Sequence, residues 1–547
     1  MAEKREDHRE QRSPSIPAWL FLGLLGVGGF LGWWTRRHEF DDAYISYRYA
    51  LNLAHGEGLV FNPGERVEGY SNLLWTLILG AGAWLGVPPH RFGPALGVLA
   101  YLALAAIGWL AIWIGLRGWT IGRRWLASAL LLSLVTSRGV AASAGSGLET
   151  FFYAALSLGA LVTWAFADRR PRLLAPLTGI LLAAAALTRP EGVIPAAALT
   201  AIELLRPSAG TNIGARLRCA VRLAWLPALA FLLQSALRLA YYGSLLPNPV
   251  YAKGMTGSHL DAGLLYLRSF AASYPIVLVF AAAAGALLVG GRGSRAERAE
   301  RPRPERSLAA GALLIAALEA ALIAWVGGDF MEYRLALHFF PLLVVAGSVA
   351  TATLLSSPSA PSSRAASPPP RLPPLVPLAV AALLLALTLV PFRPEPRFYM
   401  QSLAEMDGYV RDGTQVGLAL RGLPPGMRVA TTLIGTIGYF SGQPIVDLWG
   451  LVDRSVRTRA ARPEFVRGHL VGMSGAEAVD AGADLYLQHP HRCACDARCI
   501  DSGQEILLRL PEGDCVRAFV TSQRGATRAA LCARRDAIPV LGADVCR

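Results

Sequence analysis

Two adjacent carboxylates, Asp41 and Asp42, come shortly after the first long apolar run of this 547-residue sequence. Acidic side chains close to a membrane are costly and are usually kept for a function. Either carboxylate can take the proton of an acceptor hydroxyl as a general base. The pair can instead hold a divalent cation, Mg²⁺, Mn²⁺ or Ca²⁺, beside a phosphate leaving group. The structural alternative is a helix cap, in which Asp41 or Asp42 opens a helix at Ala43.

Three cations in later polar segments, Arg189, Lys253 and Arg334, have the chemistry to bind a phosphate. Arginine binds phosphate through two donors, and lysine acts as a point charge. The only other lysine of the chain is Lys4, so Lys253 is unusual. The structural alternative is a set of side chains that reach for the membrane surface. A binding site is favoured because four polar segments on the predicted outer face together carry both signs of charge. These segments are 147–150, 189–192, 247–254 and 327–334.

Long apolar runs must position these groups. Hydrophobic residues make up 53% of the chain and charged residues 16%, whereas an ordinary soluble domain has about 25% charged residues. Runs of about 18 or more apolar residues indicate membrane spans, so we predict an all-α polytopic membrane bundle. The candidate spans are residues 17–34, 72–87, 93–116, 125–141, 150–167, 173–188, 192–206, 222–241, 270–290, 308–326, 335–355 and 375–392.

The net charge of +14 comes mostly from short arginine-rich segments between the apolar runs. This is the pattern of cytoplasmic loops in membrane proteins, so we expect no nucleic-acid partner.

The tail 1–16 precedes a run without a small-residue cleavage site, and we expect it to stay in the cytoplasm. Twelve spans would put both termini on one side, but cysteine usage puts the C-terminus outside, so we expect about 13 spans. The predicted cytoplasmic loops are 117–124, 168–172, 206–222 and 292–306.

The apolar runs stop after residue 392. Residues 17–392 would form the membrane domain, with a first outer loop at 36–70 and a flexible Ser/Pro-rich linker at 356–374. Residues 393–547 have the size of a soluble domain, which we predict to be a small extracytoplasmic α/β domain. We expect strands within 428–435, 445–448 and 484–488, and helices at 405–412 and 475–481.

Six of the seven cysteines crowd into the C-terminal region. An even set in one polar region indicates disulfides in an oxidising compartment, which places this region outside the cytoplasm. His489 and His491 lie close to them in the sequence, so zinc binding is the alternative. Disulfides are favoured because the domain should face an oxidising space. The six are Cys493, Cys495, Cys499, Cys515, Cys532 and Cys546.

The first outer loop resembles that of the GT-C membrane glycosyltransferases. Within them it is most similar to the actinobacterial terminal arabinofuranosyltransferases. The loop reads FDDAYISYRYA over 40–50 and FNPGERVEGY over 61–70. Shorter motifs follow in the family's order as far as residue 453, and they are GLET at 147–150, TRPEG at 188–192, LPN at 246–248, YAK at 251–253, GGDFM at 327–331 and DLWGLVD at 447–453.

The resemblance implies a GT-C fold with an active site on the outer face of the bacterial inner membrane. It implies a polyprenyl-phosphate sugar, with arabinofuranose as a candidate, as donor, a cell-envelope glycan or glycolipid as acceptor, and inversion at the anomeric carbon. Asp41 and Asp42 fall at the family's catalytic positions, one as general base and the other orienting the acceptor or a metal. The other residues expected to bind substrate are Tyr44, Arg48, Glu68, Tyr70, Asn72, Glu149, Glu191, Asn248, Tyr251 and Asp329.

Two other functions are alternatives. A flippase for lipid-linked sugars would share the many spans, but it should show internal repeats and broken helices in corresponding halves, and the sequence shows no such duplication. A membrane scaffold whose outer domain binds glycan would not need the aspartate pair. We expect the C-terminal domain of a transferase to recognise the acceptor.

Overall fold

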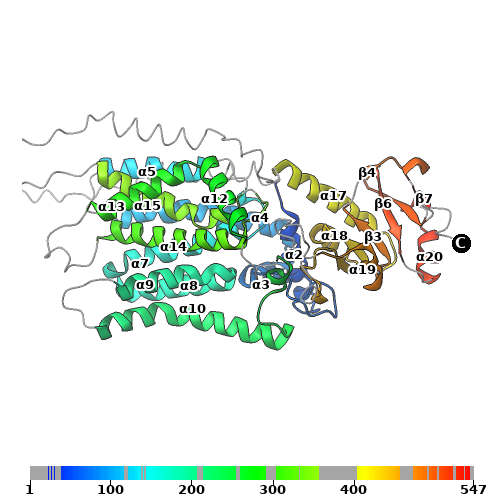
Figure 1. Cartoon of the computed structure of the whole chain (residues 1–547), viewed down its shortest axis with the longest axis horizontal. Helices are drawn as coiled ribbons and strands as arrows, with labels where there is room; N and C mark the ends of the chain where they lie inside the picture. Colours follow the sequence, from blue (N-terminus) through cyan, green and yellow to red (C-terminus); the bar gives the residue numbers. More distant parts are fainter. Residues whose placement is uncertain are drawn as a thin grey trace, which may run out of the picture.

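The computed structural model has two parts that lie side by side, and Figure 1 shows a helical bundle next to a sheet covered by helices. Helices α2 and α3 lie between them. The tail 1–16, the linker 356–374 and the predicted span 375–392 lie outside the described residues, as does most of 17–34. The described residues are 23, 26, 30, 38–115, 121–136, 140, 143–205, 213–253, 259–290, 303–331, 333–355, 403–455, 472–489, 492–499, 501, 504–521, 525–534 and 536–541.

Helices of the first part begin and end where local chemistry dictates. Pro89, Pro171 and Pro304 each lie in the first turn of a helix, where a missing N–H costs nothing. Gly327 ends α14 in the left-handed conformation, with φ 89°. The helices are α2 (Asp41–Ala54), α3 (Leu73–Trp84), α4 (Pro89–Leu110), η1 (Ala111–Gly115), α5 (Ile121–Thr136), α7 (Thr150–Ala165), η2 (Ala167–Arg169), α8 (Pro171–Thr188), η3 (Pro190–Gly192), α9 (Val193–Leu205), α10 (Ile213–Tyr242), α11 (Asn248–Ala252), α12 (Leu260–Ser273), α13 (Ile276–Val289), α14 (Pro304–Val326), η4 (Ala336–His338) and α15 (Phe340–Leu355).

Among the described residues, four helical segments are long and apolar enough to cross a membrane, namely Pro89–Trp113, α8, α10 and α14. The bent pair of α12 and α13 makes a fifth if it counts as one span. Helices α3, α7 and α15 are apolar but have 12, 16 and 16 residues, which is shorter than the about 20 residues that cross a bilayer. The chain is a membrane protein, and the number of about 13 spans stays a prediction.

The span predicted at 270–290 is not one helix. Helix α12 ends at Ser273 and α13 begins at Ile276, at an angle of 93°. Pro275 explains the break, because a proline disfavours helical geometry in the residue before it, and Tyr274 has φ −128° and ψ 63°. The span predicted at 270–290 therefore contains a break, and α13 forms its second part.

The C-terminal part contains a seven-stranded mixed sheet with the order β2-β1-β3-β6-β5-β7, and β4 lies beside β6. Strand β1 runs parallel to β2 and β3, and the other pairs are antiparallel. The strands are β1 (Val429–Thr431), β2 (Ile445–Asp447), β3 (Leu485–Gln488), β4 (Arg492–Cys493), β5 (Glu505–Arg509), β6 (Cys515–Val520) and β7 (Val540–Leu541), and the helices are α17 (Leu403–Arg421), α18 (Ile434–Ser441), α19 (Gly475–Asp480), η6 (Ala497–Cys499) and α20 (Gly525–Cys532).

Most elements predicted for this part are present. Strands β2 and β3 lie where strands were expected, and α17 and α19 cover the expected helices. The segment 428–435 is a strand only as far as Thr431, and α18 begins at Ile434. The β-branched residues of this segment favour a strand, but packing of α18 against α2 and α17 overrides that preference.

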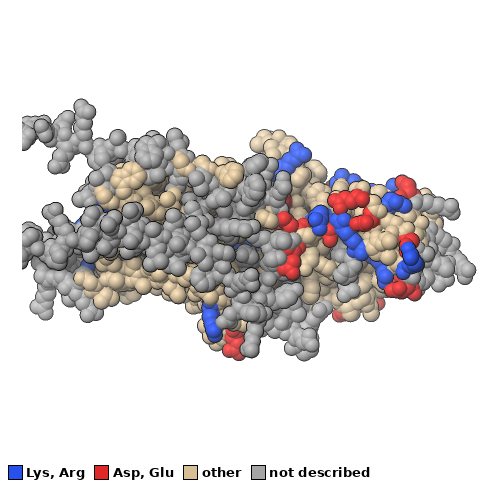
Figure 2. Space-filling view, turned by 90° about the horizontal axis from the view of Figure 1, so that it is seen from above, with Lys and Arg blue, Asp and Glu red and all other residues tan. Residues whose placement is uncertain are grey.

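The first outer loop and the C-terminal part share one hydrophobic core. Ile45 and Tyr49 of α2 and Phe61 of the loop are buried in the same cluster as Ile437 of α18 and Val429 of β1. On the face drawn in Figure 2, charged side chains gather over the C-terminal part, whereas the described surface of the bundle is largely uncharged. The loop is thus a layer between an apolar bundle and a polar domain.

A disulfide joins Cys495 to Cys515 of β6. The predicted disulfide chemistry is therefore confirmed for this pair, and Cys532 is also disulfide-bonded. Cys493 and Cys499 are free thiols. In the described part of the chain, no group of three or more His, Cys, Asp or Glu side chains is placed to hold a metal ion, and His491 lies outside that part.

Candidate active site

Asp41 and Asp42 have different partners although they are adjacent. Helix α2 begins at Asp41 after Phe40, which makes no side-chain cap, so the alternative that Asp41 or Asp42 caps a helix beginning at Ala43 does not hold. The Asp41 carboxylate instead caps α18. It accepts hydrogen bonds from the backbone N–H groups of Gly435 at 3.0 Å and Thr436 at 2.8 Å, and from the Thr436 hydroxyl at 2.5 Å. Asp41 therefore joins the outer loop to the C-terminal part.

Arg48, two turns further along α2, holds the other end of α18. Its guanidinium donates to the carbonyl of Gly438 at 2.6 Å and to that of Gln443 at 2.8 Å. Gly435 lets the N-terminal end of α18 lie close to Asp41, because a Cβ at position 435 would collide with the Asp41 carbonyl. Helix α18 is thus fixed against α2 at both ends, and it sets the orientation of the turn that carries Asp42.

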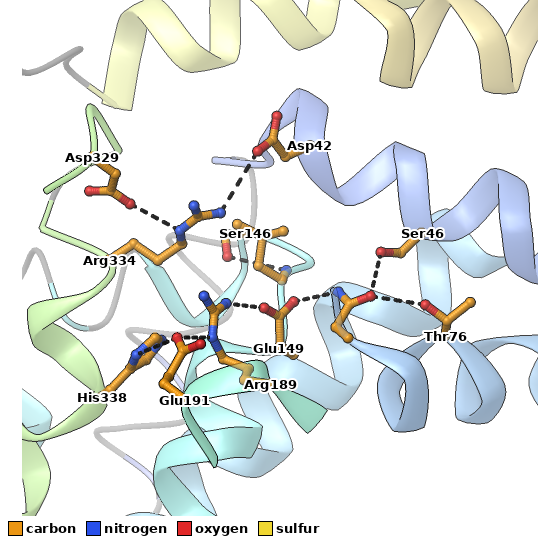
Figure 3. A network of polar contacts seen from close by, with 12 residues as sticks. Asp42, Ser46, Thr76, Ser146, Glu149, Arg189, Glu191, Asp329, Arg334 and His338 are labelled. Carbon is orange, nitrogen blue, oxygen red and sulfur yellow. Dashed lines mark hydrogen bonds and ion pairs between the residues drawn. The ribbon is translucent and has the colours of Figure 1, made fainter. Parts of the chain in front are cut away.

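Asp42 points toward Arg334, as Figure 3 shows. Its carboxylate lies 3.8 Å from the Arg334 guanidinium, and the Asp42 side chain is 24% exposed. The Nε of Arg334 donates to the Asp329 carboxylate at 3.1 Å. Asp42 therefore faces Arg334 and is partly exposed, whereas Asp41 faces α18.

A tight turn after α14 presents Asp329 and Arg334. Gly327 and Gly328 have φ values of 89° and 77°, and a Cβ on Gly328 would collide with the ring of Tyr266. Tyr333 has φ 58° and is the non-glycine residue with positive φ among the described residues. Such strain costs roughly 1–3 kcal/mol and gathers at functional sites. The strained backbone directs the neighbouring Arg334 side chain.

Arg189 lies between two carboxylates in a second network (Figure 3). Its guanidinium contacts Glu149 through Nη1 and Glu191 through Nε. Glu149 also accepts a hydrogen bond from Asn72 at 2.6 Å. Burial opposes ionisation of Glu149, yet the guanidinium groups of Arg189 and Arg334 hold its pKa below the ordinary value. Glu149 is therefore an anion that fixes Arg189.

A cavity of about 380 Å³ brings the three predicted phosphate ligands together. Arg189, Lys253 and Arg334 all line it, although they come from separate segments. Among the described residues the Lys253 ammonium makes no hydrogen bond or ion pair. Burial, with the charge of Arg334, lowers the pKa of Lys253. Lys253 is thus a cation without a direct polar contact among the described residues, and a bound anion would stabilise it. The apolar wall consists of Val193, Ile194, Pro249, Val250, Leu322, Ile323, Val326, Phe330 and Leu335.

Glu191 and Asp329 line the cavity as well, but Glu68 and Asn248 do not. The Glu68 carboxylate pairs with Arg238 of α10. The Asn248 amide donates to the carbonyls of Gly450 at 2.8 Å and Asp453 at 2.7 Å. These contacts tie the outer loop, α10 and the 447–453 motif together, so both residues have an architectural role.

The three predicted tyrosines also lie outside the cavity wall. The hydroxyl of Tyr44 donates to Glu39 at 2.5 Å, that of Tyr70 lies 3.1 Å from Tyr242, and that of Tyr251 lies 3.4 Å from Ser244. Substrate binding by these tyrosines stays a prediction, as it does for Arg48, Glu68, Asn72, Glu149 and Asn248.

Sequence reasoning misses Thr436, Glu319 and His338. Thr436 gives no local signal, because its role depends on the docking of α18 against α2. Glu319 does give a local signal in the sequence, since it is the only charged residue between 307 and 326, within an apolar run. His338 lies in the predicted span 335–355, and a single histidine in an apolar run does not by itself indicate a site.

The aspartate pair does not fit a divalent cation. Both carboxylate oxygens of Asp41 are occupied by donors from α18, and Asp42 faces a guanidinium. The two carboxylates therefore do not converge on a common point. A divalent cofactor stays a prediction.

The stability of the docked domain should depend on pH through Asp41. Burial raises the pKa of Asp41 from 3.8 to about 6, although hydrogen bonds from Thr436 and Gly435 oppose the shift. Because this pKa is higher in the folded protein than in the unfolded one, stability falls as pH rises from about 4 to about 6. We expect the Tm of the wild type minus that of Asp41→Asn to fall over this window and to stay constant above it. A difference that increases with pH in thermal melts would contradict the raised pKa.

Comparison with known proteins confirms the resemblance carried by the motifs. The terminal beta-(1->2)-arabinofuranosyltransferase of Mycobacterium tuberculosis is 28% identical over 366 residues, which are 60% of this chain and 56% of that protein. The protein of the same name from Corynebacterium glutamicum is 28% identical over 373 residues, which are 59% of this chain and 50% of that protein. The chain thus spans about half the length of these relatives.

The fold is similar to that of one solved structure. The crystal structure of ArnT from Cupriavidus metallidurans in the apo state gives a TM-score of 0.51 at 14% identity, and the match covers 93% of this chain and 98% of that chain. The mostly helical arrangement of the chain therefore agrees with the overall fold of that protein. Residues 401–512 match a domain of unknown function, DUF8728, which includes α18.

Proposed function

We propose that this chain is a membrane glycosyltransferase that moves a sugar from a polyprenyl-phosphate carrier to a cell-envelope glycan or glycolipid on the outer face of the inner membrane. The cavity in which Arg189, Lys253 and Arg334 converge beside an apolar wall carries the proposal. Its cations suit a phosphate, and its apolar wall suits a prenyl chain. Arabinofuranose is the first candidate sugar, because the similar proteins are named for its transfer.

In this mechanism Asp42 is the general base. It takes the proton of the acceptor hydroxyl while that oxygen forms its bond to the anomeric carbon. The bond from this carbon to the phosphate oxygen breaks on the opposite side, so the anomeric configuration inverts. The cations of the cavity stabilise the negative charge that develops on the leaving phosphate. A phosphate needs little protonation to leave, so one carboxylate is sufficient.

Equilibrium binding of bare polyprenyl phosphate to the detergent-purified protein tests the proposed carrier site. We expect Lys253→Met to weaken binding by roughly tenfold or more, because one charge-assisted contact contributes about 1.5–3 kcal/mol. Arg66→Met is the matched control, since Arg66 is an exposed cation stacked on Tyr241 and does not line this cavity. Equal affinities of Lys253→Met and the wild type would contradict the assignment.

A further inference from the structure

Glu319 is an acid in an apolar membrane helix. It is the only charged residue of α14 between 307 and 326, and it is 3% exposed. An ionisable group at this depth is costly and is a functional candidate by default. Glu319 lies on the same helix face as Leu322, Ile323 and Val326, and all four line the cavity that holds the phosphate-binding cations.

One oxygen of Glu319 has no hydrogen-bond partner in the described part of the chain. Its Oε1 accepts a hydrogen bond from the hydroxyl of Tyr153 at 2.7 Å. Its Oε2 is buried and has no hydrogen-bond partner among the described residues. Tyr153 thereby fixes the orientation of the carboxylate and leaves one strong acceptor for a ligand.

His338, which lies beside Tyr153, is a second buried side chain with a polar atom that has no partner among the described residues. It is 2% exposed, and its ring packs edge-on against that of Tyr153 with 4.9 Å between the ring centroids. Its Nδ1 lies 3.5 Å from Glu191, the carboxylate that also holds Arg189. Its Nε2 is buried without a partner in the described part of the chain, and His338 lines the same cavity.

The two groups need a ligand that carries hydroxyls. Neither a prenyl chain nor an ionised phosphate has a hydrogen-bond donor for the Oε2 of Glu319. The hydroxyls of a sugar can donate to the Glu319 carboxylate and can either donate to or accept from an imidazole nitrogen. We propose that Glu319 and His338, oriented by Tyr153 and Glu191, form a subsite that binds hydroxyl groups of the donor sugar. This subsite rests on the proposed function and identifies the residues that distinguish the loaded carrier from the bare one.

The test compares two ligands on the same purified protein, the sugar-loaded polyprenyl phosphate and the bare polyprenyl phosphate. For Glu319→Gln we expect the Kd of the loaded lipid to rise roughly tenfold, because an amide nitrogen, which cannot accept, replaces the oxygen that accepts from a sugar hydroxyl. The Kd of the bare lipid should stay within about twofold, since it has no sugar. The same pattern is expected for His338→Phe, which keeps a ring against Tyr153 and is a second route if Glu319→Gln does not fold.

A donor analogue that lacks one hydroxyl adds a second readout. If the deleted hydroxyl is the one that contacts Glu319 in the complete donor, the wild type should bind the analogue more weakly than the complete donor. Glu319→Gln should bind the analogue and the complete donor equally. Leu318→Met, next to Glu319 on α14 but exposed and outside the cavity wall, is the control and should leave the ratio of the two Kd values unchanged.

The outcomes separate this subsite from the proposed function. Equal weakening of both lipids, or no change for either, would overturn the sugar subsite and leave the carrier site standing. If the wild-type protein binds neither lipid, the proposed function fails and the subsite fails with it.

Discussion

Asp42→Asn should lower the rate of sugar transfer by roughly 10²–10⁴-fold, which is the usual contribution of general-base catalysis. The carboxamide keeps the shape of the side chain next to Arg334, but it cannot take the acceptor proton. Affinity for the carrier should change little, because the three cations that line the cavity are untouched. The measurement is a single-turnover transfer assay together with lipid binding.

Asp41→Asn is the matched control, since it makes the same change one residue away. We expect it to retain much more activity than Asp42→Asn, because Asp41 faces α18 and its oxygens are occupied by Gly435 and Thr436. If Asp42→Asn transferred sugar at the wild-type rate, Asp42 would not be the base.

Asp41→Ala should destabilise the protein by about 1–3 kcal/mol, because it leaves the first turn of α18 without its acceptor. The same change should slow transfer by roughly tenfold, since a small displacement of a catalytic group is costly. Thermal melts and limited proteolysis at the junction of the two parts measure the first effect. Thr436→Val removes one of the three hydrogen bonds and should give a smaller loss of the same kind.

These variants also decide between two roles for Asp41. A positioning role predicts a lower Tm together with a partial loss of activity, and both losses should be milder in Asp41→Asn, which keeps one acceptor oxygen. An unchanged Tm with complete loss of transfer would instead identify Asp41 as the base.

The three cations that line the cavity could be singled out from the sequence, because charged residues at the ends of apolar runs are costly and few. Arg189, Lys253 and Arg334 stand out for that reason, and the bundle brings them to one cavity. Pro275 is also evident in the sequence, yet a span prediction that counts only apolar residues does not predict the break before it.

The different partners of Asp41 and Asp42 were not predictable. The partner of Asp41 is Thr436, in another part of the chain, and α18 forms in a segment whose composition favours a strand. Side-chain partners that depend on the docking of two parts leave no local pattern. For the same reason Arg48 and Asn248, which have the residue types of a binding site, join those parts.

The most direct test of the proposed transferase is a reaction of purified protein with a panel of sugar-labelled polyprenyl phosphates, including arabinofuranose, and a cell-envelope glycan acceptor. The account predicts that label moves to the acceptor with inverted anomeric configuration, that one polyprenyl phosphate is released per sugar, and that Asp42→Asn prevents both. Binding of the loaded lipids without cleavage, unchanged in Asp42→Asn, would contradict the account and favour a carrier-binding or lipid-translocating protein.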